Sequence, residues 1–264
     1  MKNIQGNLQR AYSVDYNILS YHCDSFTDLR VSALCTFMQE SAWLHSDHMG
    51  IGWKILMNES NCFWALTRLK IRILKIPRWG DTITVTTWSR GTDSIQFFRD
   101  WRIFDAKGVL CAVGSSVWII MDTEHRQVQR NSSLALRFPL QGEQVFLEKL
   151  RKIPSLHAPV FSHPAPIRYS ELDMNMHMNN VSYLIRFLDS ESFLFRNENR
   201  ICEAELNFLH EATGEIPISV GKEDRDGARY YTLVNEVQKT ELCRGKIIWE
   251  PRDEIPRSPM SSSR

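Results

Sequence analysis

The chain has 264 residues, a formal net charge of +1 and a hydrophobic content of 43%. That length can bury one large core or two smaller ones, and the balanced charge gives no reason to expect a nucleic-acid partner. The six cysteines show no C-x-x-C spacing, so we expect reduced thiols in a cytoplasmic protein, without a disulfide framework or a zinc site. No apolar run approaches the roughly 18 residues of a membrane span, and no leader pattern opens the sequence, so no membrane association is expected.

The first half of the sequence predicts one long helix followed by four strands. A strand-like run over residues 12–19 leads through Asp24 to a helical pattern over 32–49, which Gly50 ends as a C-terminal cap. One long helix against an antiparallel sheet is an α+β unit. The predicted strands cover residues 64–74, 82–88, 95–104 and 109–121, with turns at 77–81 and 105–108.

The second half repeats this order after a segment in which the periodicity fades and prolines appear. A strand near Ile167 and a helix over 180–195 precede four more predicted strands, and the tail, rich in proline and serine, is expected to be disordered. The duplication favours two smaller cores over one large core. We therefore expect a first domain at 8–130, a linker at 131–161, a second domain at 162–250 and a tail at 251–264. The second-half strands are predicted at 204–208, 216–222, 230–237 and 242–249.

A short internal repeat supports the two-domain division. V-S-A-L-C-T-F from Val31 returns as V-S-Y-L-I-R-F from Val181, at an offset of 181 − 31 = 150 residues. Each copy opens a helix, and an acid, Asp24 or Asp173, lies in the strand-like piece before it. Coincidence between two amphipathic helices is the alternative, but identical residues in one register favour a duplication.

The polar run from Asp173 to Asn180 is the strongest candidate for a functional site. Asp173, Asn175 and His177 alternate, so in an extended segment all three side chains would point the same way. Asn179 can cap the helix that follows, and a helix N-terminus offers unpaired N–H groups that can stabilise an oxyanion. Taken alone, such a string is more often a turn before a helix than a catalytic site.

With other motifs, this run makes the chain resemble the acyl-acyl carrier protein thioesterases, which consist of two tandem hot-dog domains, each a long helix wrapped by an antiparallel sheet. The resemblance covers nearly the whole of residues 8–250. The lack of a transit peptide before Tyr12 fits a bacterial member related to the plant enzymes. The motifs that carry the resemblance are Met49-Gly-Ile-Gly52, Trp64-Ala-Leu-Thr-Arg68, Pro77-Arg-Trp-Gly-Asp81, Asp173 to Asn180, and Asn207-Phe-Leu-His-Glu211-Ala.

The resemblance implies hydrolysis of fatty acyl thioesters of acyl carrier protein by an activated water, without a cofactor or a metal. Plant members carry a cysteine directly after the catalytic glutamate, but this chain has Ala212 there, so a covalent cysteine mechanism has no candidate at that position. A thiolate is a good leaving group, so a base for water and a donor for the oxyanion matter most. The implied catalytic residues are Asp173, Asn175, His177 and Glu211.

The expected roles follow from the chemistry of these groups. Glu211 and Asn175 would hold and deprotonate the water, while His177 would point at the thioester. Asp173 would either fix the His177 tautomer or orient the substrate, and both roles stay open. The backbone N–H groups of Met178, Asn179 and Asn180 are candidates for an oxyanion hole.

The resemblance places the acyl tunnel mainly in the first domain. Aromatic residues there are candidates to line it, although most are expected in ordinary core. Arg68, Lys70 and Arg72 alternate along one strand face and would suit an acidic carrier protein, but a solvated face is the more common explanation. The aromatic candidates are Phe37, Phe63, Trp64, Trp88 and Phe97.

Two other functions stay open at this stage. An acyl-CoA thioesterase of the same fold would differ only in what carries the pantetheine arm, and a non-catalytic binding protein would not need Asn175, His177 and Glu211 together. A tandem chain can satisfy internally the pairing that single hot-dog proteins obtain by dimerising. Both a monomer and a homodimer therefore remain possible.

Overall fold

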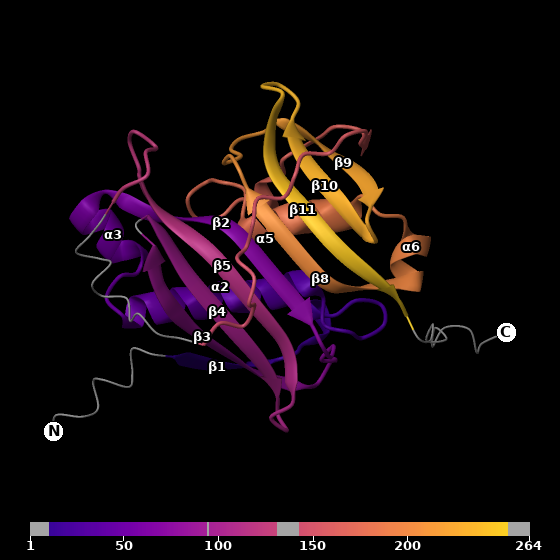
Figure 1. Cartoon of the computed structure of the whole chain (residues 1–264), viewed down its shortest axis with the longest axis horizontal. Coiled ribbons are helices and arrows are strands. Elements are labelled where there is room, and N and C mark those ends of the chain that lie inside the picture. The colour runs from indigo at the N-terminus through magenta and orange to yellow at the C-terminus, as the bar shows by residue number, and fades with distance from the viewer. Residues whose placement is uncertain (1–10, 94, 131–142, 253–264) are drawn as a thin grey trace.

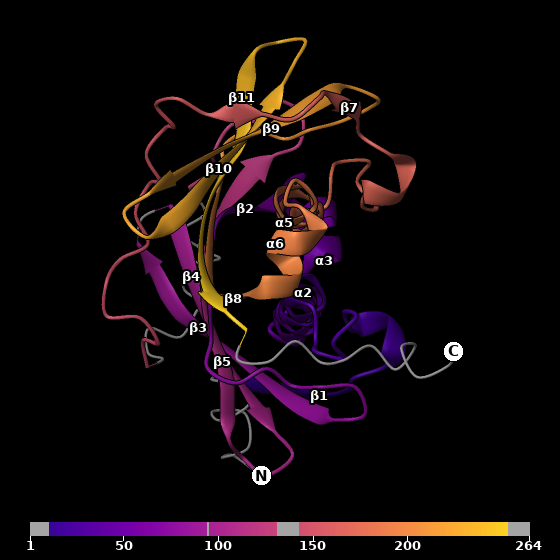
Figure 2. The same cartoon turned by 90° about the vertical axis from the view of Figure 1, so that its right-hand side faces the viewer.

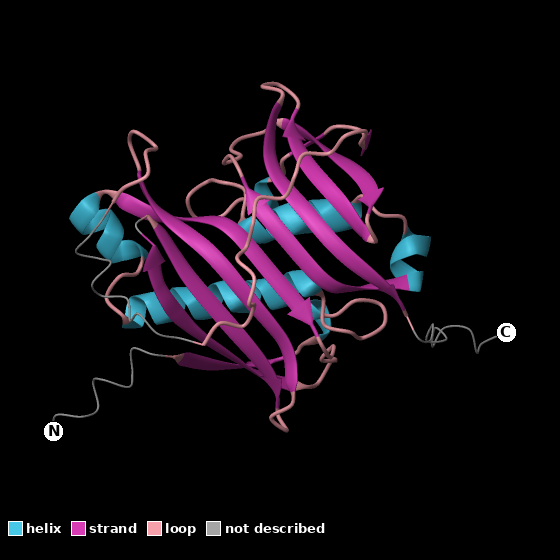
Figure 3. Ribbon diagram, in the orientation of Figure 1, coloured by secondary structure: helices cyan, strands magenta, loops and turns pink. Residues whose placement is uncertain are grey.

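The structure, a computed structural model, describes residues 11–93, 95–130 and 143–252. Within these residues eleven strands form one antiparallel sheet, and helices lie against one of its faces (Figures 1 and 3). Figure 2 shows that the sheet curves around the helices labelled α2 and α5. The arrangement confirms the predicted α+β class. No helix in the described part of the chain is long and apolar enough to cross a membrane.

The first half confirms the long helix and the four strands that its sequence predicts. The predicted turn at 105–108 is present, because Asp105 Oδ1 accepts the N–H groups of Lys107 and Val109, each at 2.9 Å. Helix α3 was not predicted, because its eight residues are too few to show a clear helical period. In order, the elements are β1 (Tyr12–Asn17), η1 (Ser20–His22), α2 (Val31–His48), α3 (Trp53–Ser60), β2 (Cys62–Ile73), β3 (Thr82–Asp93), β4 (Gln96–Asp105) and β5 (Leu110–Asp122).

The second half repeats the plan with one break in its helix. The helix predicted over 180–195 ends at Asp189, and a second helix starts after Ser192, whose Oγ accepts the Phe195 N–H at 3.1 Å. The four later strands are confirmed; three are longer than predicted, and the strand predicted at 230–237 has the predicted length but starts two residues earlier. The elements are β6 (Val160–Phe161), β7 (Ala165–Pro166), η2 (Tyr169–Glu171), α5 (Asn180–Asp189), α6 (Phe193–Glu198), β8 (Asn199–Phe208), β9 (Pro217–Arg225), β10 (Ala228–Asn235) and β11 (Thr240–Pro251).

Strands β2 and β8 join the two halves into one sheet. They pair antiparallel, with residues 68–72 opposite residues 203–207. At the centre of this seam the Lys70 side chain is 8% exposed, and its Nζ lies 3.1 Å from Glu203 Oε1 and 3.8 Å from Glu205 Oε2. The seam therefore places a buried cation between buried carboxylates.

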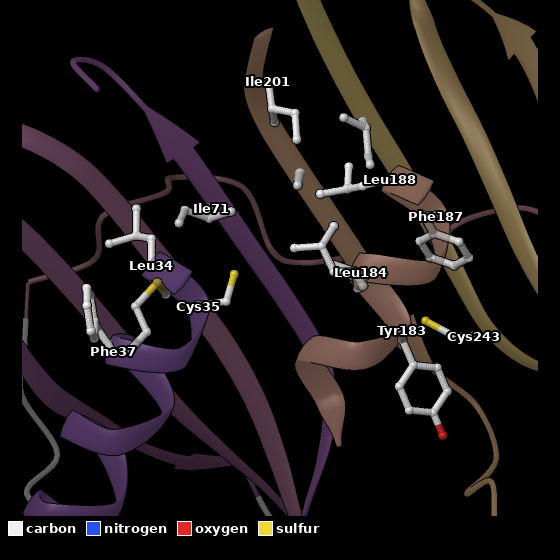
Figure 4. Packing of buried hydrophobic residues seen from close by; sticks show 14 of the residues in the cluster. Leu34, Cys35, Phe37, Ile71, Tyr183, Leu184, Phe187, Leu188, Ile201 and Cys243 are labelled. Atoms are coloured by element: carbon white, nitrogen blue, oxygen red, sulfur yellow. The ribbon is translucent and has the colours of Figure 1, made fainter. Parts of the chain in front are cut away.

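The apolar core crosses the seam as well. Leu34 of α2, Ile71 of β2 and Leu184 of α5 belong to one contiguous cluster of buried side chains (Figure 4). The expectation of two smaller cores is therefore wrong, because the paired strands carry one core through both halves. The predicted domain limits describe two repeats within one sheet, and the exact boundaries remain a proposal.

The connecting segment lies across the outer face of the sheet. This segment contributes three buried residues, Phe146, Leu150 and Ile153. The Arg68 guanidinium donates to the Leu150 carbonyl. Lys70 also approaches this segment, with Nζ 3.2 Å from Glu148 Oε1. The expectation of a solvated face at Arg68 and Lys70 is thus wrong, because the segment covers it. Residues 131–142 of the expected linker, and the expected tail from residue 253, lie outside the described residues.

Candidate functional site

The run from Asp173 to His177 forms a tight turn and not the extended segment that its alternation suggests. Asp173 Oδ1 accepts the N–H of Asn175 at 2.8 Å and that of His177 at 3.2 Å. Asp173 N–H donates to the His177 carbonyl at 2.7 Å, and Met176 adopts a left-handed φ of +61°. The expectation of three polar side chains on one face of a strand is therefore wrong. The Asp173 carboxylate instead holds the turn closed.

Glu211 approaches this turn from the loop that follows β8. Its Oε1 lies 3.7 Å from His177 Nδ1, with the Glu211 side chain 35% exposed and the His177 side chain 18% exposed. The backbone holds the two segments together, because the Met178 N–H donates to the Ala212 carbonyl at 2.8 Å and His177 forms a bridge with Thr213. The fold thus brings two of the predicted catalytic side chains into contact.

Arg126, which was not predicted, contacts both members of this pair. Its Nη1 lies 3.0 Å from Glu211 Oε2, and its Nη2 lies 3.2 Å from His177 Nε2. Arg126 belongs to the first half, whereas Glu211 and His177 belong to the second. The sequence offers only an arginine in a polar turn after a strand, which is too common a feature to predict this contact.

The turn that carries Arg126 is fixed by the end of β5. Asp122 Oδ1 accepts the N–H of Glu124 at 2.9 Å and that of His125 at 2.7 Å. The hydrogen bond from the His125 N–H is the largest cause of a lowered pKa of the Asp122 carboxyl, and the bond from the Glu124 N–H lowers it further. Asp122 N–H in turn donates to the Gln127 carbonyl at 2.9 Å, which closes the turn around Arg126.

An apolar cavity of about 140 Å³ lies beside the Asp173 turn. Asp173, Asn175 and Asn180 form its wall in the second half, and the rest comes from the first half. Trp64, one of the predicted substrate-binding residues, lines this cavity, with Nε1 donating to the Ile51 carbonyl at 3.0 Å. The aromatic lining consists of Trp43, Trp53, Phe63, Trp64, Phe97, Phe98 and Trp118.

Arg99 adds a polar spot to this apolar wall. It is 5% exposed, and its guanidinium hydrogen-bonds with His45 Nδ1 at 2.8 Å and donates to Thr87 Oγ1 at 3.1 Å. Burial lowers the pKa of this guanidinium to about 9, so it still carries its charge at neutral pH.

Three predicted substrate-binding residues lie outside the cavity. Phe37 is in the core, stacked on Tyr16 with ring centroids 4.4 Å apart. Trp88 points to the outer face, where its Nε1 donates to the Glu143 carbonyl at 2.9 Å. Arg68 also points outward and is bound to the connecting segment. Residue type alone does not reveal which face of a helix or strand a side chain occupies, so a role for these three residues in binding substrate remains a prediction that this cavity does not support.

The candidate oxyanion donors are not equivalent. The Met178 N–H donates to the Ala212 carbonyl and the Asn179 N–H donates to the Glu171 carbonyl, both at 2.8 Å, so these two groups are already used. Asn179 Oδ1 caps the helix by accepting the Val181 N–H at 2.9 Å. Asn180 opens α5 beside the cavity, and its N–H has no acceptor among the described residues.

Family models match most of the chain. The model described as the acyl-ACP thioesterase N-terminal domain matches residues 9–133, and the one described as the acyl-ACP thioesterase C-terminal domain matches residues 157–251. Among individual proteins, the chloroplastic palmitoyl-acyl carrier protein thioesterase of Cuphea hookeriana is 24% identical over 260 residues. That match covers 91% of this chain but 62% of the Cuphea protein.

Solved structures show the same fold at low identity. An acyl-ACP thioesterase from Bacteroides thetaiotaomicron superposes with a TM-score of 0.81 at 21% identity, over 91% of this chain and 98% of that one. The 12:0-ACP thioesterase from Umbellularia californica also gives a TM-score of 0.81, at 20% identity over 92% of this chain and 98% of that one. These matches confirm the predicted tandem hot-dog arrangement.

Proposed function

The chain belongs to the acyl-ACP thioesterase family, and from this we propose that it hydrolyses fatty acyl thioesters of acyl carrier protein to a free fatty acid and the carrier's thiol. The observation that carries the proposal is the pairing of His177 with Glu211, at 3.7 Å, beside a turn whose Asn175 lines an apolar cavity. A proton-accepting pair next to an apolar cavity suits thioester hydrolysis.

Glu211 is the proposed general base. A water held between its carboxylate and the Asn175 amide loses a proton to the carboxylate as its oxygen attacks the thioester carbon. The carbonyl oxygen gains the negative charge, and the C–S bond then breaks to release the carrier's thiolate. The proton held by Glu211 is returned to that thiolate, so the base is regenerated for the next turnover.

The Asn180 N–H is the proposed oxyanion donor. It opens α5 beside the cavity, where the helix dipole favours negative charge. Of the three candidates that the sequence suggests, Met178 and Asn179 are the weaker ones because their N–H groups already bind backbone carbonyls. His177 would face the thioester from the other side of the turn.

The acyl chain is proposed to occupy the aromatic cavity of the first half. Trp64, Phe63 and Phe97 supply apolar surface there, while Asp173 and Asn175 mark the end at which the carbonyl would lie. The proposed protein partner is an acylated carrier, and a cytoplasmic location is proposed because six free thiols suit a reducing compartment. One chain already pairs its two halves through β2 and β8, so we propose that a monomer suffices.

The test is single-turnover release of fatty acid from matched panels of acyl carrier protein and acyl-CoA thioesters. Glu211→Gln keeps the shape but removes the base, and we expect its rate to fall by roughly 100- to 10,000-fold. Glu215→Gln, an exposed change in the same loop, is the matched control and should leave the rate unchanged.

Each other outcome has a definite meaning. Faster release from acyl-CoA than from the carrier would make the chain an acyl-CoA thioesterase. Binding of acyl thioesters without turnover would contradict hydrolysis altogether. An unchanged rate in Glu211→Gln would remove Glu211 from the mechanism.

A further inference from the structure

We propose that Arg126 is a positioning residue whose guanidinium fixes His177 as its Nδ1-protonated tautomer and holds the imidazole beside Glu211. This inference rests on the proposed function, because it concerns the same catalytic pair. Its distinguishing feature is that the orienting group comes from the first half of the chain, whereas the pair that it orients belongs to the second.

The contact with Arg126 determines whether His177 Nε2 carries a proton. Arg126 Nη2 lies 3.2 Å from His177 Nε2. A guanidinium carries five N–H donors and no acceptor, so Nε2 must accept and cannot hold a proton in this contact. The proton of the neutral ring must then be on Nδ1.

The contact with Glu211 agrees with the same tautomer. His177 Nδ1 lies 3.7 Å from Glu211 Oε1, which is too long for a hydrogen bond but close enough for a favourable charge interaction. An N–H at Nδ1 points positive charge at the carboxylate, whereas a lone pair there would face the carboxylate unfavourably. Both neighbours of the ring therefore favour the Nδ1–H form.

One guanidinium holds both groups at once. Arg126 Nη1 lies 3.2 Å from Glu211 Oε1 and 3.0 Å from Glu211 Oε2, while Nη2 contacts the imidazole. This fork fixes the distance between the base and the ring, which a point charge on a flexible stem would do less well.

Arg126 is itself held in place by its surroundings. Its guanidinium carbon lies 5.1 Å from the centroid of Phe63, a residue of the cavity wall. Its backbone has a left-handed φ of +54° within the turn that Asp122 closes. Thr123 ties this turn to the end of α3, because its N–H donates to the Asn61 carbonyl at 3.0 Å. The orienting group is therefore presented by a fixed turn.

The tautomer can be read directly by long-range ¹H–¹⁵N correlation on protein labelled with ¹⁵N-histidine. In the neutral imidazole at about pH 8, His177 should show a protonated Nδ1 and an unprotonated Nε2. Loss of the signals in His177→Gln assigns them among the eight histidines. A protonated Nε2 in the wild-type protein would overturn the proposal.

The variants separate orientation from folding. Arg126→Met keeps the length of the side chain without a donor, so the Nδ1–H form should give way to a mixture of tautomers. Arg126→Lys returns a cationic N–H donor on a flexible stem, so it should restore part of the Nδ1–H form. Arg130→Met, four residues later on an exposed position, is the matched control and should change nothing. An unchanged tautomer in Arg126→Met would also overturn the proposal.

Kinetics supply the second readout. We expect Arg126→Met to lower kcat by roughly 10- to 100-fold, the range seen when the partner that orients a ligating imidazole is removed, with a smaller change in KM. An equal kcat in Arg126→Met and wild type would contradict the positioning role. The tautomer measurement needs no turnover. A wild-type protein that hydrolyses no acyl thioester would therefore refute the proposed function, and the NMR result would still test the role of Arg126.

Discussion

Asp24 and Asp173 make the same pair of hydrogen bonds in the two halves of the chain. Asp24 Oδ1 accepts the N–H groups of Phe26 at 2.9 Å and Asp28 at 3.1 Å, and Asp173 Oδ1 accepts those of Asn175 and His177. The two carboxylates are 173 − 24 = 149 residues apart. The Asp173 carboxylate therefore closes its turn in the same way as Asp24 does, although the turn that Asp24 closes contains no histidine.

This duplication predicts how Asp173 substitutions behave. Asp173→Asn keeps an oxygen that can accept both N–H groups, so we expect it to retain activity within about tenfold of wild type. Asp173→Ala leaves the turn open, and its loss of hydrogen bonds to a charged acceptor should cost roughly 1.5–3 kcal/mol of unfolding free energy. Single-turnover rates and urea unfolding measure the two effects. Equal and severe loss of activity in both variants, with stability unchanged in Asp173→Ala, would point to direct chemistry at the carboxylate instead.

The turn around Arg126 should depend on the ionised Asp122 carboxylate. Its pKa is lowered in the folded protein, so it adds stability above the ordinary carboxyl pKa of roughly 3.9, and this stability is lost as pH falls through the folded value. A ¹³C carboxyl titration should therefore find Asp122 below the ordinary value. Asp122→Ala should loosen the turn and lower kcat in the same direction as Arg126→Met. An ordinary titration midpoint for Asp122 would contradict this account.

Ala42 offers a test of the cavity as the acyl site. It is buried, and it lines the cavity from α2. Ala42→Phe should fill part of the cavity and lower kcat/KM most for the longer substrates. Each methylene that no longer fits should lower kcat/KM by about fourfold, which corresponds to roughly 0.8 kcal/mol per buried CH₂. Rates across a chain-length series measure this. A uniform fall at every chain length would place the acyl chain elsewhere.

The seam should depend strongly on Lys70. Lys70→Met removes the cation beside the largely buried Glu205 carboxylate, whereas Glu203 keeps its ion pair with Arg72 at 2.7 Å, so we expect a loss of about 3 kcal/mol in urea unfolding. Burial already raises the pKa of Glu205, and loss of Lys70 should raise it further. Lys75→Met, which removes an exposed ion pair with Asp105, is the control and should change stability little. Similar losses in both variants would contradict a buried network.

Much of the fold could be predicted because its strands are long and its turns carry clear signals. The helix repeat also identified the duplication, but its offset of 150 differs by one from the structural offset. The N-caps Arg30 and Asn179 are 149 residues apart, so the second half has one more residue, Asn180, between its cap and the repeated sequence. A repeat in an amphipathic helix reports which residues face the core, and this does not determine where the helix begins.

The site could be predicted only in part. His177 and Glu211 carry recognisable motifs, whereas the contact with Arg126 joins residues 51 and 85 positions away along the chain and exists only once the two halves are assembled. The alternation of polar residues over Asp173 to His177 is compatible with an extended segment and with a turn, so it did not predict the turn. The left-handed backbone of Met176 gives no signal in the sequence. Sequence pattern therefore located the residues of the candidate site but not their geometry.

The seam between β2 and β8 has a consequence for how the two repeats can diverge. Where two identical subunits assemble, every substitution appears twice, and a histidine lost from one turn is lost from both. In this chain each repeat can change alone. The position that matches His177 is Asp28, which holds Arg252 at 2.8 Å and Arg78 at 3.2 Å. In the first copy of the turn this position pairs with two arginines of the same chain, whereas in the second copy it carries the imidazole that lies beside Glu211.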